Sequence, residues 1–373
     1  MSEIYFDNAS TTKMFDDDIE KYFELLKKYY ANVNSSHKLG VEALKVFEIE
    51  KKQLNSLFPL FDIIFTSGAS ESNNLAIMGI ANRHSKVKKH IITSKMEHPS
   101  VLNTISALEK KGFEVDYIDS YIDGEILFSQ VEKLLREDTL LVSLMSVNNE
   151  VGSISDVSKI AKLIKEKSSA FFHCDMSQSI GKLNFNYENI DLITFSAHKI
   201  HSLKGVGFLL KKKQISLTPL IYGGGQQENL RSGTINYLSN VIAMKTIRKM
   251  ILHIDDSYKY IKDLNTYFLE KLSKIENIEV LNNKKSSPYI ISIYLKDKKV
   301  EVVFNALSNK LIFVSTKSAC SSEDKSFSKS VFALCKDKKK ASNSIRISLS
   351  IENSKEEIDV FIEEIKKITE GVI

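Results

Sequence analysis

Short apolar runs alternate with stretches of helical periodicity through roughly the first 200 residues of the chain. Runs of about four to eight apolar residues are typical of buried strands, and apolar residues spaced three and four apart are typical of helices. We predict strands at 62–65, 90–93, 113–117, 140–147, 171–174 and 192–195, and helices at 71–81, 101–110 and 157–167. This order predicts an α/β domain with a mainly parallel sheet flanked by helices, whose ligand binds at the carboxyl ends of the strands.

A different order of elements begins near residue 236. A long helical pattern runs to about residue 275 and precedes strand patterns at 289–295 and 344–350, with helical patterns at 300–308 and 355–368. These elements predict a smaller α+β domain. We therefore expect a large domain over residues 15–255 and a small domain built from residues 1–14 and 256–373.

Composition is that of an ordinary globular protein, with 373 residues of which 43% are hydrophobic and 27% are charged. The net charge of +5 is spread as lysines over predicted helices, so we expect no direct binding of nucleic acid. Lysine runs at 211–213 and 336–340 are interpreted as solvated loops. No apolar run approaches the roughly 18 residues of a membrane helix, and no secretory leader is evident. We expect a cytoplasmic protein that does not bind membranes.

The chain has three cysteines, Cys174, Cys320 and Cys335, which cannot all pair and which lack the close spacing of a zinc site. We expect no metal site and a reducing compartment. Cys174 and Cys335 follow apolar residues and read as core positions. Cys320 lies instead in a run of small and charged residues, where Lys317 and Lys325 could favour its thiolate. Cys320 is therefore a candidate nucleophile.

Two predicted strands end in side chains suited to cofactor chemistry. The run 171–174 precedes Asp175 and Gln178, and the run 192–195 precedes Ser196, His198 and Lys199. A positioned lysine can form a Schiff base with an aldehyde, and a carboxylate can keep a pyridine nitrogen protonated. Taken singly, a solvated lysine and a helix cap are ordinary alternatives for Lys199 and Asp175. Together, on neighbouring strands, they favour the cofactor interpretation.

Polar side chains also follow other predicted strands. Ser70 opens a helix and could bind a phosphate, His98 could lie flat on an aromatic ring, and Asn149 could bind a ring oxygen or a carboxylate. Arg346, in the strand pattern 344–350, could hold a substrate carboxylate through two hydrogen bonds. A helix cap, a surface histidine, a turn and a surface arginine are the respective alternatives. These alternatives do not explain why the side chains converge on one edge of one sheet.

With these residues assembled, the chain resembles the pyridoxal-phosphate-dependent cysteine desulfurases of the class-V aminotransferase family, in the branch that supplies sulfur for iron–sulfur clusters and tRNA thiolation. The resemblance covers nearly the whole chain. The matching segments are 5–12, 65–74, 97–99, 148–152, 175–178, 196–199, 223–226, 231–234, 318–322 and 344–350. One departure is Lys317, where a glycine is common in the family.

The resemblance implies a fold-type-I homodimer that binds pyridoxal 5′-phosphate. Lys199 would hold the cofactor as a Schiff base, His98 would stack on its ring, and Asp175 would pair with its ring nitrogen. The other cofactor-binding residues implied are Ala69 (through its backbone), Ser70, Asn149, Gln178, Ser196, His198 and, from the partner subunit, Thr234.

The implied reaction converts L-cysteine to L-alanine and leaves the sulfur on Cys320 as a persulfide. Lys199, His98 and Cys320 would be catalytic, while Asn149 and Arg346 would bind the substrate carboxylate. The sulfur would pass to an acceptor protein, either an iron–sulfur scaffold or a tRNA-thiolation protein. A selenocysteine lyase or another aminotransferase-like enzyme of the same fold is an alternative, although it would not need the Cys320 loop. A non-catalytic partner protein would not need every cofactor-facing residue.

Overall fold

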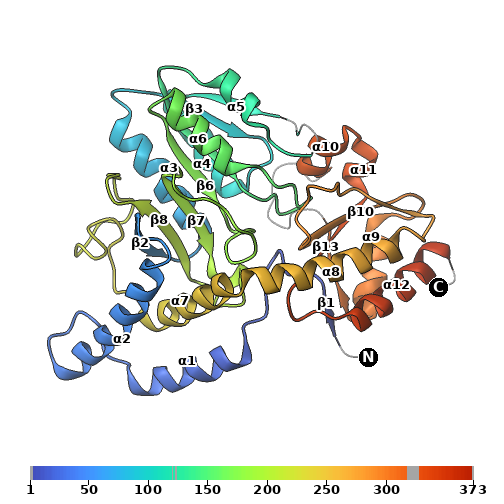
Figure 1. The fold of residues 1–373 in the computed structure, drawn as a ribbon, viewed down its shortest axis with the longest axis horizontal. Helices are drawn as coiled ribbons and strands as arrows, with labels where there is room; N and C mark the ends of the chain where they lie inside the picture. Colours follow the sequence, from blue (N-terminus) through green and yellow to red (C-terminus); the bar gives the residue numbers. More distant parts are fainter. Residues whose placement is uncertain (1–2, 120, 122–123, 317–326, 372–373) are drawn as a thin grey trace.

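The computed structural model describes residues 3–119, 121, 124–316 and 327–371. Figure 1 shows a large sheet with helices on both sides at one end of the molecule and a smaller sheet at the other end. Helix α8 (Ile254–Leu272) runs along both parts. Within the described ranges, every helix is too short or too polar to span a bilayer.

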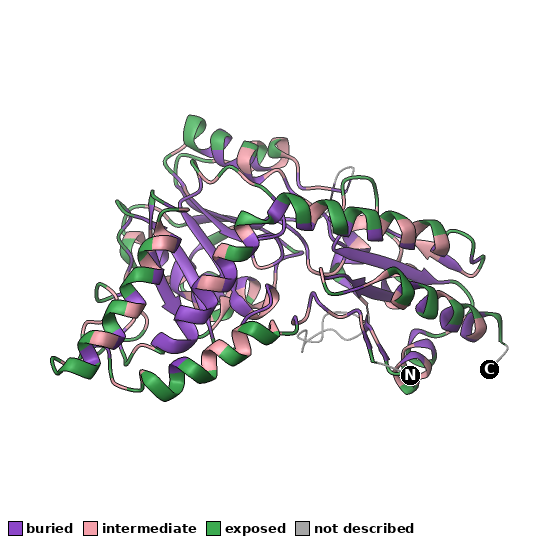
Figure 2. Cartoon of the chain, turned by 60° about the horizontal axis from the view of Figure 1, so that its bottom comes forward, coloured by how far each residue is buried: buried purple, intermediate pink, exposed green. Residues whose placement is uncertain are grey.

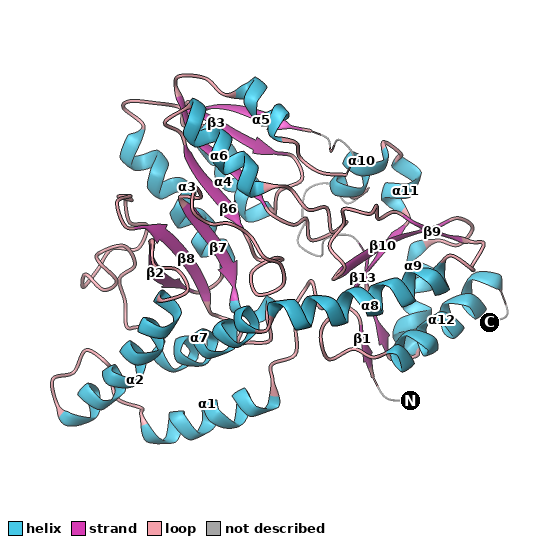
Figure 3. Ribbon diagram, viewed as in Figure 1, coloured by secondary structure: helices cyan, strands magenta, loops and turns pink. Residues whose placement is uncertain are grey.

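The large sheet has strands from 61 to 212, coloured magenta in Figure 3. Their bounds are β2 Phe61–Thr66, β3 His90–Ser94, β4 Glu114–Ile118, β5 Thr139–Met145, β6 Phe171–Asp175, β7 Leu192–Ser196 and β8 Gly207–Lys212. They lie in the order β2, β8, β7, β6, β5, β3, β4, and β8 is antiparallel to both of its neighbours. All neighbouring pairs from β7 to β4 are parallel, which confirms the predicted α/β class with a mainly parallel sheet.

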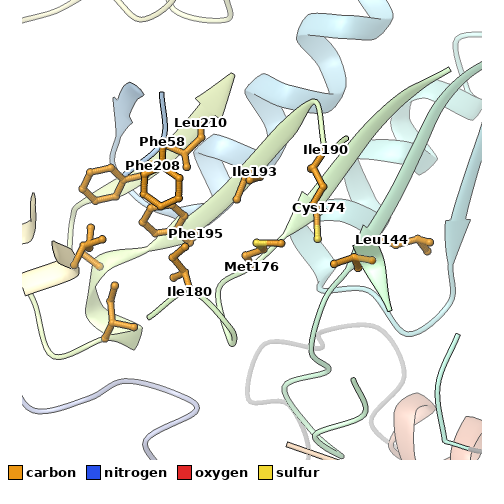
Figure 4. Close-up of a cluster of buried hydrophobic side chains, with 14 of the residues drawn as sticks. Phe58, Leu144, Cys174, Met176, Ile180, Ile190, Ile193, Phe195, Phe208 and Leu210 are labelled. Atoms are coloured by element: carbon orange, nitrogen blue, oxygen red, sulfur yellow. The ribbon is translucent and has the colours of Figure 1, made fainter. Parts of the chain in front are cut away.

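Both faces of this sheet are buried because consecutive apolar residues alternate between two helical layers. Ile91 and Leu192 pack with one layer, whereas the next residues, Ile92 and Ile193, pack with the other. Figure 2 shows the resulting buried centre, and Figure 4 shows part of the second layer, with Cys174 among its apolar side chains. The first layer contains α3 Ala69–His84 and α4 Pro99–Glu109; the second contains α2 Lys38–Asn55, α5 Phe128–Leu134, α6 Val157–Lys167 and α7 Tyr237–Leu252. Helix α1, Asp16–Lys28, packs beside α7.

The smaller sheet is antiparallel, in the order β12, β13, β10, β9. A separate pair of parallel strands, β1 and β11, places Ile4 and Tyr5 beside Ile312 and Phe313. The strand bounds are β1 Ile4–Tyr5, β9 Ile278–Val280, β10 Ile290–Leu295, β11 Ile312–Phe313, β12 Ser315–Thr316 and β13 Ser344–Ser348. The remaining helices are α9 Val300–Asn309, α10 Lys329–Cys335, α11 Lys338–Ser342 and α12 Lys355–Glu370.

Helix ends follow local sequence signals. Ser354 begins α12 with a capping box, in which its hydroxyl and the Glu357 side chain satisfy each other's backbone N–H groups, and Gly371 ends the helix in the left-handed conformation. His98 caps α4, whose first residue is Pro99. These signals fix where each chain segment leaves the sheet edge.

Three sequence-based expectations were wrong. The lysine run 211–213 was predicted to be a solvated loop, but Lys211 and Lys212 are buried at the end of β8, where they pair with Asp62 and Asp191. The run at 336–340 enters a short helix, α11, in which Asp337 caps the first turn. The predicted long helix 236–275 is interrupted at His253, whose φ of −111° separates α7 from α8.

Candidate active site

A pocket of about 500 Å3 lies at the carboxyl ends of β5, β6 and β7, where the large sheet faces Arg346 of the small sheet. Its volume suits a small organic ligand. Among the described residues, the pocket lining contains all of the predicted site residues except Thr234: Ala69, Ser70, His98, Asn149, Asp175, Gln178, Ser196, His198, Lys199 and Arg346.

Asp175 is the last residue of β6, and its carboxylate is held in place from two sides. The Ser177 backbone N–H donates to Oδ1 at 2.9 Å, and the Asn73 side-chain amide donates to Oδ2 at 2.9 Å. Asn73 is itself fixed by an accepted hydrogen bond from Thr194 and by donation to Ser100. A buried carboxylate with these donors is oriented toward a cationic partner in the pocket.

Lys199 stands at the end of the 3-10 turn that follows β7. Its Nζ donates to the backbone oxygens of Ala9 at 2.6 Å and Ser10 at 2.7 Å. The half-buried amine therefore points into the pocket beside the segment that continues from β1. These two partners are neutral backbone carbonyls, which can release the amine without leaving an unpaired charge, so Lys199 can exchange these contacts for a bond to an aldehyde.

The N-terminus of α3 forms an anion cradle. Its cap residue, Gly68, supplies no side-chain hydrogen bond, and the Ala69 backbone N–H donates to Ser196 Oγ at 2.6 Å. The start of a 16-residue helix presents backbone N–H groups and a partial positive charge to an anion such as phosphate. A side chain at Gly207 would come within 2.3–2.6 Å of the Gly68 backbone, so the absence of a Cβ on β8 allows the cradle to sit against this strand.

His98 combines the cap of α4 with a place in the pocket wall. Its Nδ1 accepts the Ser100 backbone N–H at 3.1 Å, so the proton of the neutral ring lies on Nε2. Burial lowers the pKa of His98; the Asp175 charge opposes this shift and the Lys199 charge adds to it. The imidazole is therefore neutral near pH 7 and can lie against an aromatic ring.

His198 joins the pocket to the segment that follows β1. Thr11 Oγ1 lies 3.2 Å from His198 Nδ1, while the Thr12 backbone N–H donates to the His198 oxygen at 2.8 Å. Burial, and then the charges of Lys199 and Lys204, lower the pKa of His198 to about 4. A neutral His198 can donate a hydrogen bond to an anion without bearing a charge.

Arg346, on β13, is held by three hydrogen bonds from its terminal nitrogens. Its Nη1 donates to the Asn149 backbone oxygen at 2.8 Å, and its Nη2 donates to Asp7 at 2.7 Å and to Ser10 Oγ at 2.6 Å. The buried Nε has no hydrogen-bond partner among the described residues. Because Arg346 lines the pocket and a guanidinium can bind a carboxylate through two hydrogen bonds, Arg346 is a candidate to hold a carboxylate there.

Gln178 and Asn149 complete the polar wall. Gln178 Nε2 donates to the Ala9 oxygen at 2.9 Å, which leaves a second amide hydrogen for another acceptor. The Asn149 side chain lines the pocket, and its backbone carries the contact with Arg346.

Comparison with known proteins gives a match over residues 4–361 to the model of a family described as aminotransferase class-V. The chain belongs to this family. The predicted family and fold are thereby confirmed.

Curated relatives of this class-V aminotransferase family member include a cysteine desulfurase IscS of Buchnera aphidicola subsp. Baizongia pistaciae, which is 36% identical over 371 residues, covering 96% of this chain and 91% of the relative. A cysteine desulfurase IscS of Dictyoglomus turgidum is 35% identical and covers 99% of this chain and 95% of the relative. A solved NifS-like protein has a TM-score of 0.93 at 33% identity, with 99% of this chain and 100% of that chain covered. A structure described as SspA in complex with cysteine has a TM-score of 0.81 at 29% identity, covering 94% and 99% of the two chains.

Of the predicted site residues that the structure describes, Thr234 alone does not line the pocket. Thr234 is exposed on the loop after Gly233, and this loop is tied to the start of α3 because Arg231 Nε donates to Glu71 at 2.9 Å. Cys320 lies outside the described residues. The flanks of its segment are described: Ser315 pairs with Arg346, and Ser328 Oγ donates to Glu150 Oε2 at 2.6 Å.

The sequence did not identify several residues that shape this pocket. Asn73 holds Asp175, and Asp7 and Ser10 hold Arg346. Asn73 lies near the start of α3, and its burial and its contact with Asp175 become evident only in the folded chain. Ser10 is a local partner of Asp7, but Arg346 is more than 300 residues away, so no local pattern could reveal the contact between Asp7 and Arg346.

Proposed function

We propose that the protein is a pyridoxal-phosphate-dependent cysteine desulfurase that converts L-cysteine to L-alanine and places the sulfur on Cys320. The observation that carries the proposal is the convergence of Lys199, Asp175, His98 and Arg346 on one pocket. Membership of the class-V aminotransferase family and the cysteine desulfurase relatives support the same reaction.

The residues present fit pyridoxal phosphate. The phosphate would bind the α3 cradle with Ala69, Ser70, Ser196 and His198. Lys199 Nζ would hold the aldehyde carbon covalently. Asp175 would keep the ring nitrogen protonated, Gln178 would donate to the ring oxygen, and His98 would cover the ring face. When bound, this cofactor stores the electron pair that is released at the substrate α-carbon.

The substrate would be oriented by its carboxylate. Arg346 and Asn149 both line the pocket, and their side chains would bind that carboxylate. Binding the carboxylate at this point leaves the amino group of L-cysteine directed toward Lys199. Once the substrate replaces it, Lys199 Nζ would take the proton from the substrate Cα and later return a proton to the carbon skeleton.

The sulfur step would be a nucleophilic attack. The Cys320 thiolate would attack the substrate sulfur, a new S–S bond would form and the Cβ–S bond would break, with its electron pair left on the carbon skeleton. Protonation of that skeleton gives L-alanine, and Cys320 carries one extra sulfur as a persulfide. Both flanks of the segment that contains Cys320 contact residues next to the pocket, namely Arg346 and Glu150.

We also propose a homodimer in which Thr234 of one subunit reaches the phosphate site of the other. A shallow groove between α3 and α4 shares Ser70 and His98 with the pocket and could receive a partner loop. Phe23, Tyr30 and Tyr222 are 55%, 72% and 75% exposed, which is unusual for side chains that are not covered by another surface.

The proposed domain division is that predicted from the sequence, with a large domain at 15–255 and a small domain at 1–14 and 256–373. The break between α7 and α8 at His253 supports the second boundary. A separate apolar core under the small sheet supports the division as a whole.

We propose a cytoplasmic location, because Cys174 and Cys335 are free thiols and a persulfide carrier requires reduced Cys320.

The decisive experiment measures sulfide and alanine released from L-cysteine in the presence of dithiothreitol. We expect equimolar products from the wild type and from Cys335→Ser, a matched control at a cysteine that is partly exposed. Cys320→Ser should retain the near-visible absorbance of the bound cofactor yet release no sulfide, whereas Lys199→Ala should lose that absorbance. Undiminished sulfide release by Cys320→Ser would contradict the proposed nucleophile. A cofactor-loaded wild type that releases nothing would contradict the proposed substrate.

A further inference from the structure

Helices α10 and α11 carry a cluster of exposed lysines: Lys329, Lys336, Lys338 and Lys339. We call these residues the α10–α11 lysine cluster. Within the described ranges, none of the four forms an ion pair. The cluster is therefore a local excess of positive charge rather than a network of surface salt bridges.

The acidic side chains that touch these helices are already engaged. Asp337 accepts the backbone N–H groups of Lys339 and Lys340 at 2.8 and 3.2 Å. Glu279 accepts from Lys340 Nζ at 2.5 Å, and Glu150 accepts from Ser328 at the start of α10. Asp337 still carries a negative charge between Lys336 and Lys338, so the cluster keeps a net positive charge with that carboxylate included.

The cluster lies on the side of the molecule where the proposed sulfur carrier returns to the folded chain. Asn148 Nδ2 donates to Ser330 Oγ at 3.1 Å, so α10 packs directly on the loop that carries the pocket residue Asn149. Figure 1 shows α10 and α11 side by side, and α11 leads into β13 beside the Leu295 end of β10. Because Cys320 precedes Phe327 by seven residues in the sequence, we expect a protein that takes sulfur from Cys320 to bind near the start of α10.

We propose that the α10–α11 lysine cluster is a docking surface for an acidic face of the protein that accepts sulfur from Cys320. This inference rests on the proposed desulfurase function. The acceptor thiolate would attack the outer sulfur of the Cys320 persulfide, an S–S bond would form on the acceptor, and Cys320 would leave as a thiolate that regains a proton. Complementary charge would speed encounter and orient the acceptor without requiring a large apolar interface.

A protein partner fits the cluster better than RNA. Single-stranded RNA is usually bound by exposed aromatic side chains interleaved with basic ones. The aromatic residues in contact with these helices, Phe327 and Phe332, are half-buried and pack on each other with ring centroids 5.4 Å apart. A thiol is also needed to receive the sulfur, and RNA has none.

The test uses the cofactor-loaded enzyme, L-cysteine and two synthetic acceptor peptides of equal length. One peptide contains a single cysteine among glutamates, and the other replaces each glutamate by glutamine. The measured quantity is the rate of persulfide formation on the peptide cysteine. We expect at least about tenfold faster transfer to the acidic peptide at low salt, and the difference should disappear as ionic strength rises above roughly 0.3 M.

Two variants, each with four Lys→Gln substitutions, test whether the preference for the acidic peptide depends on the α10–α11 lysine cluster. Lys329→Gln, Lys336→Gln, Lys338→Gln and Lys339→Gln together should remove the preference for the acidic peptide. The matched control, Lys86→Gln, Lys89→Gln, Lys110→Gln and Lys111→Gln, removes four exposed lysines at the amino ends of β3 and β4, which is the opposite edge of the sheet. This control should keep the preference in full. Sulfide release with dithiothreitol should be the same in both variants and the wild type.

Three results would overturn the proposal: equal rates with the two peptides, an undiminished preference in the cluster variant, or tighter binding of a short single-stranded RNA than of the acidic peptide at the same cluster. A failure of the desulfurase proposal is distinct from these, since it would appear as no dithiothreitol-dependent sulfide from the wild type. In that case, binding of the acidic peptide measured by fluorescence anisotropy still tests the surface.

Discussion

Lys182 is a buried charge that the proposed reaction does not use. The residue is 5% exposed, and its described contacts include no hydrogen bond or ion pair; its Nζ lies 5.6 Å from the centre of the Tyr289 ring. Burial, and then the charges of Lys199 and Arg346, lower the pKa of Lys182 to about 7. His198 and His201, whose pKa values are also lowered in part by the Lys182 charge, are the other titratable groups near it.

We expect Lys182→Met to stabilise the apoprotein in a pH-dependent way. The pKa of an unfolded lysine is near 10.4, so above that pH Lys182 is neutral in both the folded and the unfolded state. Its burial then carries no charge penalty. As pH falls from about 10.4 to about 7, only the unfolded state gains the proton, and the wild type loses stability. Below about pH 7 the wild type bears the full free-energy penalty of burying the charged Lys182, on the order of 4 kcal/mol for a pKa shift of this size. Thermal unfolding midpoints from pH 6 to 10 measure this difference.

The gain from Lys182→Met should therefore be largest at pH 6 to 7 and should shrink toward pH 10. Lys259→Met on the exposed face of α8 is the matched control, and its midpoint should follow the wild type at every pH. A gain that stays constant over the whole range would mean that the effect of the methionine is apolar packing rather than removal of a titrating charge.

At the scale of elements, the contact of β8 with the start of α3 joins stability to cofactor affinity. We expect Gly207→Ala to weaken binding of pyridoxal phosphate, since the new methyl group would overlap the Gly68 backbone and push the cradle away from Ser196. The unfolding midpoint is measured with and without added cofactor. The increase produced by the cofactor should be smaller in Gly207→Ala than in the wild type.

Ser354→Ala gives the comparison for that experiment. It removes the capping box of α12, far from the cradle, at a cost of about 1 kcal/mol. Its midpoint should fall equally with and without cofactor. If Gly207→Ala shows this same uniform loss, the contact between β8 and α3 supports the fold but not the phosphate site.

Much of the large sheet could be predicted because its strands are continuous apolar runs and its helices have clear periodicity. Asp175, Lys199 and His98 could be singled out because each directly follows such a run. Strand β8 could not be recognised, since Lys211 and Lys212 make its end look polar until Asp62 and Asp191 are placed beside it by pairing across the sheet. Long-range ion pairs of this kind leave no trace in a local pattern.

The site also depends on residues whose importance is set only by the whole fold. The hydrogen bond between Arg346 and Asp7 and the contacts of Lys199 with Ala9 and Ser10 join distant parts of the chain. Family resemblance identified Arg346 and Lys199, but not the carboxylate and carbonyls that hold them. These partners are known only once β1 is paired with β11 and Asp7 lies beside Ser348.

At the scale of the whole molecule, each active site of the proposed dimer contains residues from both chains. We expect a mixture of two inactive variants, Lys199→Ala and Thr234→Glu, to recover activity after refolding together. The glutamate would repel the phosphate of the neighbouring site, whereas a mixed dimer has one site with both Lys199 and Thr234 intact. Random mixing should restore about a quarter of the wild-type sulfide release, because half of the dimers are mixed and each has one intact site.

The same mixture made without refolding is the control and should stay inactive while the subunits do not exchange. Sedimentation of the wild type should give twice the mass of one chain. Activity of Thr234→Glu alone, at the wild-type level, would show that Thr234 does not reach a partner's phosphate.

The segment from Asp7 to Thr12 has a consequence for the order of events during synthesis. These residues leave the ribosome early, yet the contacts that join them to the pocket need Gln178, His198, Lys199 and finally Arg346, which emerge much later. The large sheet can form while the chain is still being translated, but the wall of the pocket closes only when nearly the whole polypeptide is made. Cofactor capture is therefore a late, post-translational step, and the nascent chain carries no assembled catalytic centre.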